Sequence, residues 1–288
     1  MILRAIAIMV ASMALLALSD AFIKLSSLRA PMGQTMFLLS TGGTVLFIAM
    51  ARMRGVLIWS RDFWHPMVLV RNGFEIIGAI GLIIGISKVP LSIFAAIMQV
   101  APLITILGAA LFLGEHVGWR RWAAVLVGLT GMLIVIRPFG ASFSGWELFA
   151  VFGVSGLAGR DLVTRLAPSD IPALTLSTWG FAATIPVGLC VYMFEDMPLT
   201  AEPIALIHIL GAILFTTFGY LAVTAAMRMA PVSIVAPFRY TRLLFTTSLG
   251  ILVFGERPDG PTLIGASLVL AAGIYSFLRE RKLLQNTD

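Results

Sequence analysis

Residues 90–113 read PLSIFAAIMQVAPLITILGAALFL, a run without a charged residue. A helix rises about 1.5 Å per residue, so a run of about 20 apolar residues crosses the roughly 30 Å hydrocarbon core of a bilayer. Comparable apolar stretches occur along the whole chain, near residues 3–23, 33–51, 66–87, 120–137, 145–165, 172–193, 203–227, 232–254 and 261–278. The breaks between them are too short for a soluble domain. Because the apolar runs are continuous and not alternating, they predict an all-α membrane protein of ten transmembrane helices and not a β-barrel.

The composition favours the same class. Of 288 residues, 59% are hydrophobic and 12% are charged, whereas a soluble domain carries about 25% charged residues. The net charge of +6 is spread singly or in pairs between apolar runs, which excludes a basic stripe for nucleic acid. Cys190 is the single cysteine and the 3 histidines lie far apart, so we expect neither a metal site nor a cofactor.

The distribution of lysine and arginine predicts the orientation. With the N-terminus inside, the predicted cytoplasmic segments contain Arg4, Arg52, Arg54, Arg61, Arg120, Arg121, Arg165, Arg228, Arg279, Arg281 and Lys282. The opposite side contains Lys24, Arg29, Lys88, Arg137 and Arg257. Since cytoplasmic loops carry the excess of basic residues, we expect a multi-pass protein of the inner (plasma) membrane with both termini in the cytoplasm.

Two motifs occur twice along the chain. Pro90-Leu-Ser-Ile93 has a counterpart in Pro231-Val-Ser-Ile234, and Leu111-Phe-Leu-Gly-Glu115 has one in Leu252-Val-Phe-Gly-Glu256. Both pairs are separated by 141 residues (231 − 90 and 252 − 111). The pattern predicts two homologous five-helix halves, residues 1–138 and 139–279, followed by a short cytoplasmic tail at residues 280–288. An odd number of spans inverts the second half, and inverted repeats place a substrate site near the membrane midplane and permit alternating access.

The same motifs carry a family resemblance. With Ala101-Pro-Leu103 and Gly128-Leu-Thr-Gly131, the stretch from Ser87 to Pro138 resembles an EamA domain of the drug/metabolite transporter superfamily. Residues 231–275 resemble a second copy, and the chain, including Pro237-Phe-Arg-Tyr240, also resembles the YddG-type exporters of amino acids, aromatic ones included. The resemblance implies a ten-helix basket whose cavity is lined by helices 1–4 and 6–9. Arg242 stands where many relatives are apolar, so the resemblance does not fix the substrate.

Six charged residues fall at similar depth within three of the predicted spans, where an ionised group costs roughly 2.5–3.5 kcal/mol. They are Arg71, Glu75, Arg160, Asp161, Arg239 and Arg242. Arg71 and Glu75 are four residues apart and are expected to pair. Counted from the predicted cytoplasmic ends, all six lie in the inner half of the membrane, so we expect one cluster whose surplus of arginine suits a substrate carboxylate. Arg71, Glu75, Arg160 and Asp161 are candidates for a gate or for proton coupling. The alternative is that Arg71, Arg160 and Arg239 extend to the lipid headgroups.

Three further residues are candidates to line the substrate cavity. Gln99 and Tyr240 are again 141 residues apart (240 − 99), and both are expected near the midplane. They either orient a polar substrate or form hydrogen bonds between helices. Trp179 either stacks against a substrate or packs in the protein core.

Together these features predict a secondary transporter that exports small metabolites, with amino acids as the first candidates. The sequence contains no GxxxxGK[ST] motif, so direct use of ATP is excluded, while proton-coupled, exchange and facilitated transport stay open. The alternative is small-drug efflux or carriage of another metabolite; a membrane-embedded enzyme would need a nucleophile and base that the sequence does not offer. The expected partners are a small substrate and the bilayer, and a monomer is sufficient.

Overall fold

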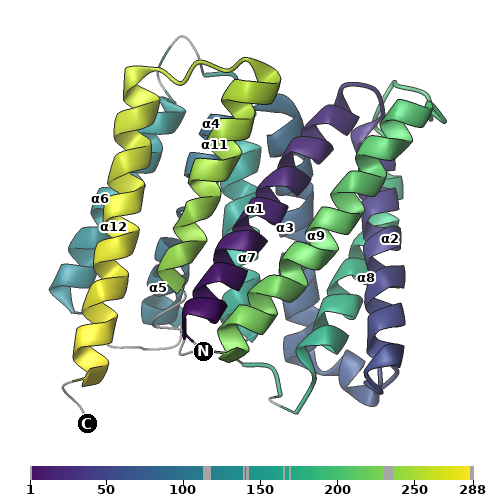
Figure 1. Cartoon of the computed structure of the whole chain (residues 1–288), viewed down its shortest axis with the longest axis horizontal. Helices are drawn as coiled ribbons and strands as arrows, with labels where there is room; N and C mark the ends of the chain where they lie inside the picture. Colours follow the sequence, from purple (N-terminus) through teal and green to yellow (C-terminus); the bar gives the residue numbers. More distant parts are fainter. Residues whose placement is uncertain are drawn as a thin grey trace. The chain divides into compact units, whose positions relative to one another are not determined.

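The computed structural model describes residues 2–112, 118–138, 140, 143–164, 166–168, 170–229 and 236–285, and every regular element in these ranges is a helix (Figure 1). The chain divides into two compact units. Unit 1 comprises Met1–Leu18, Val89–Glu147 and Phe218–Asp288, and unit 2 comprises Ser19–Lys88 and Leu148–Thr217. Both divisions near residues 18 and 217 fall inside helices, so α1 (Ile2–Ser27) and α9 (Pro203–Met229) each contribute to both units.

Unit 2 is built around a pair of helices that pack along each other. Besides parts of α1 and α9, it contains α2 (Met32–Met53), η1 (Arg61–Trp64), α3 (Pro66–Lys88), α7 (Glu147–Thr164, from Leu148) and α8 (Ala173–Tyr192). Helix α2 packs along α8, and α3 packs against α8 as well. The buried apolar side chains between them are Ala51, Ile58, Val68, Ile171, Leu176 and Trp179.

Helices α3 and α7 approach each other along glycines. Gly81 faces the backbone of Gly153, and a Cβ at either position would overlap the other helix. Gly156 faces the backbone of Gly78, and Gly78 faces Leu157. Residue numbers therefore rise on α3 as they fall on α7, and the two helices are antiparallel. Continuing this register by one turn places Glu75 opposite residues 159–160. Small residues therefore bring two charged helix segments together, as they do in other membrane bundles.

Unit 1 contains the remaining helices. They are α4 (Leu91–Met98), α5 (Ala101–Phe112), α6 (Trp119–Ile136), η2 (Ala236–Tyr240), α11 (Thr241–Phe254) and α12 (Gly260–Gln285), with parts of α1 and α9. Helix α6 packs along α12, and α11 lies against α4. Between them, Val100, Leu103, Val125, Val269 and Ala272 form one buried apolar cluster.

The quoted run at residues 90–113 is interrupted within its predicted span. Helix α4 ends at Met98 and α5 begins at Ala101. Pro102 has no N–H to donate to the carbonyl of Met98, which accounts for the break at this point. In the predicted span 232–254 the 3-10 helix η2 runs directly into α11, between Tyr240 and Thr241.

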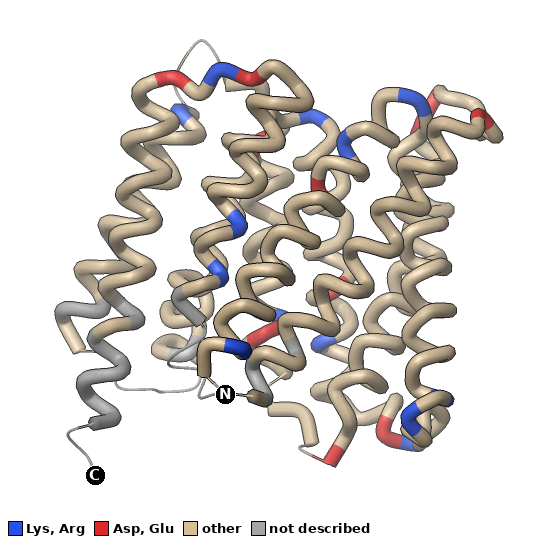
Figure 2. The backbone as a smooth tube through the Cα atoms, in the orientation of Figure 1, with Lys and Arg blue, Asp and Glu red and all other residues tan. Residues whose placement is uncertain are grey.

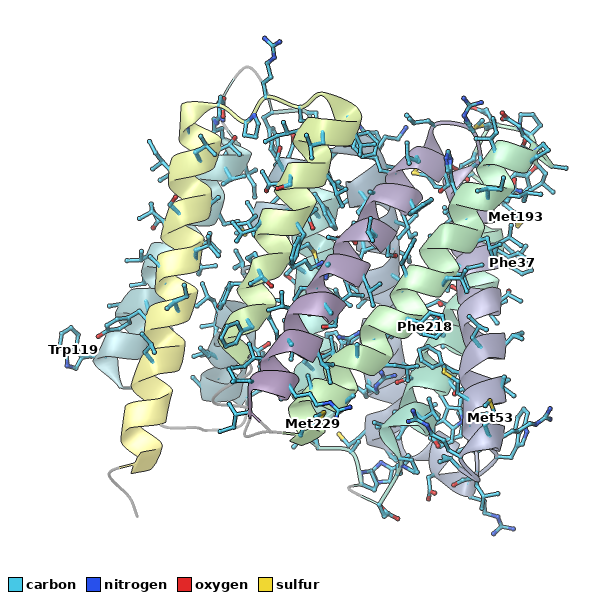
Figure 3. All side chains as sticks on the ribbon, in the orientation of Figure 1. Phe37, Met53, Trp119, Met193, Phe218 and Met229 are labelled. Carbon is cyan, nitrogen blue, oxygen red and sulfur yellow. The ribbon has the colours of Figure 1, made fainter. Side chains whose placement is uncertain are left out.

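Each of the ten predicted spans coincides with helix in the described ranges. By length and hydropathy six of them are candidates to cross a membrane, namely Ile2–Ser27, Met32–Met53, Pro66–Lys88, Leu91–Phe112, Ala173–Tyr192 and Pro203–Val223. The count of ten membrane crossings stays a prediction. Large apolar side chains such as Met53, Trp119 and Met193 extend outward from their helices (Figure 3), and they are 85%, 75% and 80% exposed. Lysine, arginine and carboxylate positions gather at helix ends, with few along the helices (Figure 2).

Parts of the repeated motifs lie outside the described residues. These parts are Leu113 to Glu115 of the first half and Pro231 to Ile234 of the second half. Arg165 and the last three residues of the predicted tail also lie outside them.

Candidate functional site

Two helices of unit 2 bring four of the predicted charged residues into one chain of ion pairs. Arg71 and Glu75 lie one turn apart on α3, with 2.9 Å between Arg71 Nη2 and Glu75 Oε2. Arg160 of α7 approaches the other oxygen of the same carboxylate, with 3.0 Å between Nη1 and Oε1. Arg160 Nη2 also lies 2.8 Å from Asp161 Oδ1. The pair expected from the spacing of Arg71 and Glu75 is present, and the register of α3 and α7 explains why Arg160 joins it.

Exposure increases along this chain of ion pairs. The side chains of Arg71, Glu75, Arg160 and Asp161 are 3%, 10%, 17% and 37% exposed. Buried ions are tolerated in proteins when they are paired and hydrogen-bonded, and two guanidinium groups here balance two carboxylates. The surplus of arginine expected from the sequence depends on Arg239 and Arg242, which belong to unit 1.

Arg71 does not extend to the headgroups, as the alternative interpretation of this residue requires. Its Nη1 donates hydrogen bonds to the carbonyl of Leu176 and to Asn72 Oδ1, both at 3.0 Å. Within the described chain, Arg71 Nε and Asn72 Nδ2 are buried and have no acceptor. A buried donor without an acceptor costs about 1–3 kcal/mol. This part of the group therefore has two donor nitrogens that an oxygen atom of water or of a solute would satisfy.

Trp179 lies in the core of unit 2. Its side chain is 5% exposed and packs in the apolar cluster with Ile58 and Val68. The indole Nε1 donates to the carbonyl of Ile58 at 3.0 Å. Phe63 contacts the ring edge to face, with 5.4 Å between ring centroids. These contacts match the packing alternative, and contact with a substrate stays a prediction.

Gln99 and Tyr240 meet in unit 1, where α4 and η2 end. Gln99 follows the last residue of α4, and its Nε2 donates to the backbone carbonyl of Tyr240 at 3.1 Å. Both residues are 8% exposed. The phenol of Tyr240 packs against Gly273 of α12, where a Cβ would overlap its hydroxyl oxygen. The two positions related by the 141-residue offset are thus in contact, through the amide of one and the backbone of the other.

The two arginines of this region differ in their surroundings. Arg239 lies in η2 and is exposed, whereas Arg242 lies in the first turn of α11 and is partly buried. Contact of either residue with a substrate stays a prediction, as does a role of Gln99 or Tyr240 in binding.

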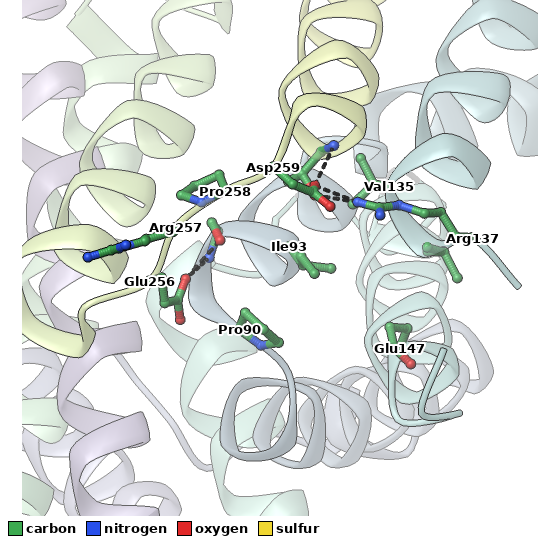
Figure 4. A pocket seen from close by; sticks show the side chains of 12 residues that line it. Pro90, Ile93, Val135, Arg137, Glu147, Glu256, Arg257, Pro258 and Asp259 are labelled. Carbon is green, nitrogen blue, oxygen red and sulfur yellow. Dashed lines mark hydrogen bonds and ion pairs between the residues drawn. The ribbon is translucent and has the colours of Figure 1, made fainter. Parts of the chain in front are cut away.

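Unit 1 also contains a pocket of about 240 Å³ that sequence reasoning did not anticipate (Figure 4). On one wall the carboxylate of Glu256 accepts hydrogen bonds from the backbone N–H groups of Leu91 and Ser92 and from the Ser92 hydroxyl, and so caps α4. The glutamate of the second Gly-Glu motif therefore has a structural contact at a helix N-terminus.

On another wall of the pocket, Arg137 joins the end of α6 to the start of α12 (Figure 4). Its Nη2 lies 2.5 Å from Asp259 Oδ1 and 3.1 Å from the hydroxyl oxygen of Thr262. The hydrogen bond from Arg137, with further ones from Thr262, holds the pKa of the Asp259 carboxyl well below its usual range. Arg137 and Asp259 are 122 residues apart, so no local pattern could have paired them.

The sequence profile of the EamA-like transporter family matches residues 3–137 and again residues 144–278. Curated relatives include a riboflavin transporter of Rhizobium johnstonii, 30% identical over 74% of this chain and 72% of that protein. A pseudopaline exporter of Pseudomonas aeruginosa is 28% identical over 88% of this chain and 89% of that protein. An S-adenosylmethionine uptake transporter of Rickettsia bellii is 26% identical over 77% and 75% of the two chains.

One solved structure, described as a crystal structure of a protein, has the same fold. It is 17% identical, covers 97% of this chain and 98% of its own, and superposes with a TM-score of 0.64. The three named relatives are transporters of small molecules and not enzymes, and none of the three is named as an amino acid exporter. With its family profile matched over both halves and its many apolar helices, the chain belongs to the EamA-like transporter family, a family of multi-pass membrane proteins within the drug/metabolite transporter superfamily.

Proposed function

We propose that this protein is a secondary transporter that moves small, carboxylate-bearing metabolites by alternating access of two inverted five-helix halves. The halves are residues 1–138 and 139–279. The two matches to the family profile support this division, because they are offset by 141 residues (144 − 3 and 278 − 137). Helix starts follow the same offset: α2 begins at Met32 and α8 at Ala173, and α6 begins at Trp119 and α12 at Gly260.

The observation that carries the proposal is the buried chain of ion pairs in unit 2. Both oxygens of Glu75 are already in ion pairs with guanidinium groups. Arg160 contacts two carboxylates, so the carboxylate of a solute competes with Glu75 or Asp161 for one guanidinium fork. Exchange of that partner separates or rejoins α3 and α7, which is how a gate operates. Asp161, the most exposed of the four, is the proposed site of proton exchange.

For the substrate itself we propose Gln99, Tyr240, Arg239 and Arg242 of unit 1. The break after α4 at Gln99 and the change from η2 to α11 at Tyr240 support this assignment, because transporters often bind substrates where a helix is discontinuous. The two arginines provide the positive charge that a carboxylate requires. Trp179 is left out of the proposed binding group because its ring and N–H already have partners.

Amino acid export, aromatic amino acids included, is the proposed activity within this class. The named relatives include uptake and export proteins, and their printed substrates are riboflavin, S-adenosylmethionine and pseudopaline. We therefore propose export from the sequence resemblance to amino acid exporters alone, with both termini in the cytoplasm. Carriage of another metabolite of this kind is the alternative.

Counterflow in proteoliposomes tests the proposal. Purified protein is reconstituted with a panel of amino acids, dicarboxylates, riboflavin and S-adenosylmethionine, and exchange of each labelled solute is measured. Exchange of an amino acid that Arg239→Ala or Arg242→Ala lowers at least tenfold supports the assignment. If riboflavin or S-adenosylmethionine is exchanged and no amino acid is, the proposed substrate is wrong and the proposed transport activity stands. If Asp161→Asn leaves the response to an imposed pH gradient unchanged, Asp161 is not the coupling site.

Cysteine accessibility tests the orientation. In a variant with Cys190 replaced by serine, single cysteines at positions 60 and 281 should react from the cytoplasmic side. Labelling of the two positions from opposite sides contradicts the predicted topology.

A further inference from the structure

The turn between α2 and α3 presents arginine and tryptophan side chains in an arrangement that the transport proposal does not use. We define the arginine–tryptophan turn as residues 52–64, which begin in the last turn of α2 and end with η1. Arg52, Arg54 and Arg61 are all exposed. Between and beside them Trp59 and Trp64 are 89% and 72% exposed. Large apolar rings with this exposure mark a surface that contacts something other than water.

The three arginines of the turn contrast with others in the same unit. Three arginines elsewhere in unit 2 are in ion pairs with carboxylates: Arg29, Arg71 and Arg160. In the part of the chain that the structure describes, no carboxylate lies within ion-pair distance of Arg52, Arg54 or Arg61. Asp62 is the one acidic residue of the turn, and its carboxylate accepts from the Ser60 hydroxyl. The turn therefore has a net charge of +2 (three arginines minus one aspartate), and none of its three arginines is in an ion pair with a described carboxylate.

The backbone beneath these side chains is held in place by α8. The carbonyl of Leu57 accepts from the Thr175 hydroxyl at 3.0 Å, and the carbonyl of Ile58 accepts from Trp179 Nε1 at 3.0 Å. The Ile58 side chain is buried, while its neighbours Leu57 and Trp59 are 81% and 89% exposed. This alternation is that of an extended segment anchored on one face. The exposed side chains are thus displayed by a fixed backbone.

Phe63 and Trp64 are ordered in the same way. Phe63 packs edge to face on Trp179 in the core, and Trp64 packs edge to face on Phe63 with 5.1 Å between ring centroids. The Ser60 hydroxyl accepts the N–H of Asp62 at 3.0 Å and caps η1. The ring of Trp64 consequently stands outside the unit on a short, rigid chain of aromatic contacts.

The position of the turn in the chain indicates that it contacts the headgroup layer of the bilayer. It connects α2 and α3, both of which are long and apolar enough to cross a bilayer, so the turn lies where the hydrocarbon ends and the headgroups begin. Indole rings favour that layer, and guanidinium groups bind phosphate oxygens in bidentate geometry. A helix C-terminus accounts for cations at Arg52 and Arg54, but it does not account for Arg61 or for the two exposed indoles.

We propose that the arginine–tryptophan turn is a binding site for anionic phospholipid headgroups, selective for phosphatidylglycerol-type lipids over zwitterionic phosphatidylcholine. The indoles lie at the glyceryl level, and the three guanidinium groups neutralise lipid phosphates that carry an uncompensated charge. The site is separate from the proposed transport residues.

Fluorescence quenching by brominated lipids tests the site directly. The full-length protein is reconstituted in vesicles of dibrominated phosphatidylglycerol or dibrominated phosphatidylcholine, and the ratio of the two lipid-binding constants is measured. The part of the quenching lost in Trp59→Phe/Trp64→Phe reports the turn itself. We expect the turn to prefer phosphatidylglycerol, and each arginine replaced by glutamine to lower that preference by up to about fivefold at low ionic strength.

Matched variants separate charge at this turn from charge in general. Arg52→Lys/Arg54→Lys/Arg61→Lys retains the charge and should keep most of the preference, whereas the corresponding triple glutamine variant should lose it. Arg257→Gln, which removes an exposed charge of unit 1, should leave the local preference unchanged. Circular dichroism and counterflow check that each variant is folded.

Three results would overturn the proposal. The first is an unchanged lipid preference in the triple glutamine variant. The second is equal quenching with and without Trp59 and Trp64, which would mean that the indoles do not meet lipid. The third is displacement of the lipid by glycerol phosphate or by polyglutamate at equal charge concentration, because that would assign the turn to a soluble anion or to an acidic protein.

Discussion

Replacement of Glu75 by glutamine should leave the buried guanidinium group of Arg71 without an anionic partner. In the intact protein the two oxygens of Glu75 lie 2.9 Å and 3.0 Å from the guanidinium groups of Arg71 and Arg160. After the substitution Arg160 still has Asp161, but Arg71 retains neutral acceptors, the Leu176 carbonyl among them. The Arg71 side chain is 3% exposed, so bulk solvent screens its charge poorly once the carboxylate is lost. Removing one partner of a buried ion pair costs about 3–5 kcal/mol, and we expect Glu75→Gln to lower the free energy of unfolding by that amount.

Unfolding in a mixed-micelle denaturant titration measures this cost. Asp161→Asn is the matched control: its side chain is 37% exposed, so solvent screens the loss, and we expect less than about 1 kcal/mol. The double variant Arg71→Met/Glu75→Gln has no charge at position 71 that needs a partner. It should recover most of the free energy of unfolding lost in Glu75→Gln, with a coupling energy of about 2 kcal/mol or more. If Glu75→Gln costs less than about 1 kcal/mol, or if the double variant is as unstable as the sum of the singles, the ion pair is not the structural unit described here.

Two further predictions concern the same helices and the pocket of unit 1. A Cβ at Gly180 would lie 2.5 Å from Arg71 Nη1, whereas one at Gly73 meets nothing within 4 Å, so Gly180→Ala should lower the melting temperature and Gly73→Ala should leave it unchanged or raise it slightly. The lowered pKa of Asp259, caused first by its hydrogen bond from Arg137, means that this contact stabilises the fold above the ordinary aspartate pKa near 3.9 and is lost as the pH falls below it. The difference in melting temperature between the wild type and Asp259→Asn should therefore be constant from about pH 7 to 4 and shrink on further acidification. A difference that already disappears near pH 6 would contradict this assignment.

Hydropathy alone located the helices closely, because apolar length is what a bilayer selects. The stretch expected at residues 172–193 is the helix Ala173–Tyr192, and that expected at 66–87 is Pro66–Lys88. Interruptions inside an apolar run were harder to place. Residues 90–113 form one apolar run without a charged residue, and the break after Met98 follows from the backbone donor that Pro102 lacks, which hydropathy does not record.

One of the ion pairs could be predicted from local sequence spacing, and another could not, because it depends on how two helices pack. The pair of Arg71 with Glu75 follows from a spacing of four residues on one helix. The pair of Glu75 with Arg160 does not, because it depends on the antiparallel register of α3 and α7. That register is set by glycines on both helices, Gly81 and Gly153 among them, whose close approach leaves no room for a side chain. Single glycines in apolar runs are common, and the sequence alone does not indicate which of them face each other.

Gln99 and Tyr240 illustrate what a repeat can and cannot predict about chemistry. The offset of 141 residues identified two equivalent positions, and they are in contact. The contact itself is unsymmetrical, because the amide of Gln99 donates to the backbone carbonyl of Tyr240. Any residue at position 240 could accept that hydrogen bond through its backbone carbonyl. The bond therefore accounts for the glutamine at position 99, whereas the phenol of Tyr240 is accounted for by its packing on Gly273. Equivalent positions in the two halves therefore occupy equivalent places in the fold. Their side chains contact different residues, so the role of each must be tested separately.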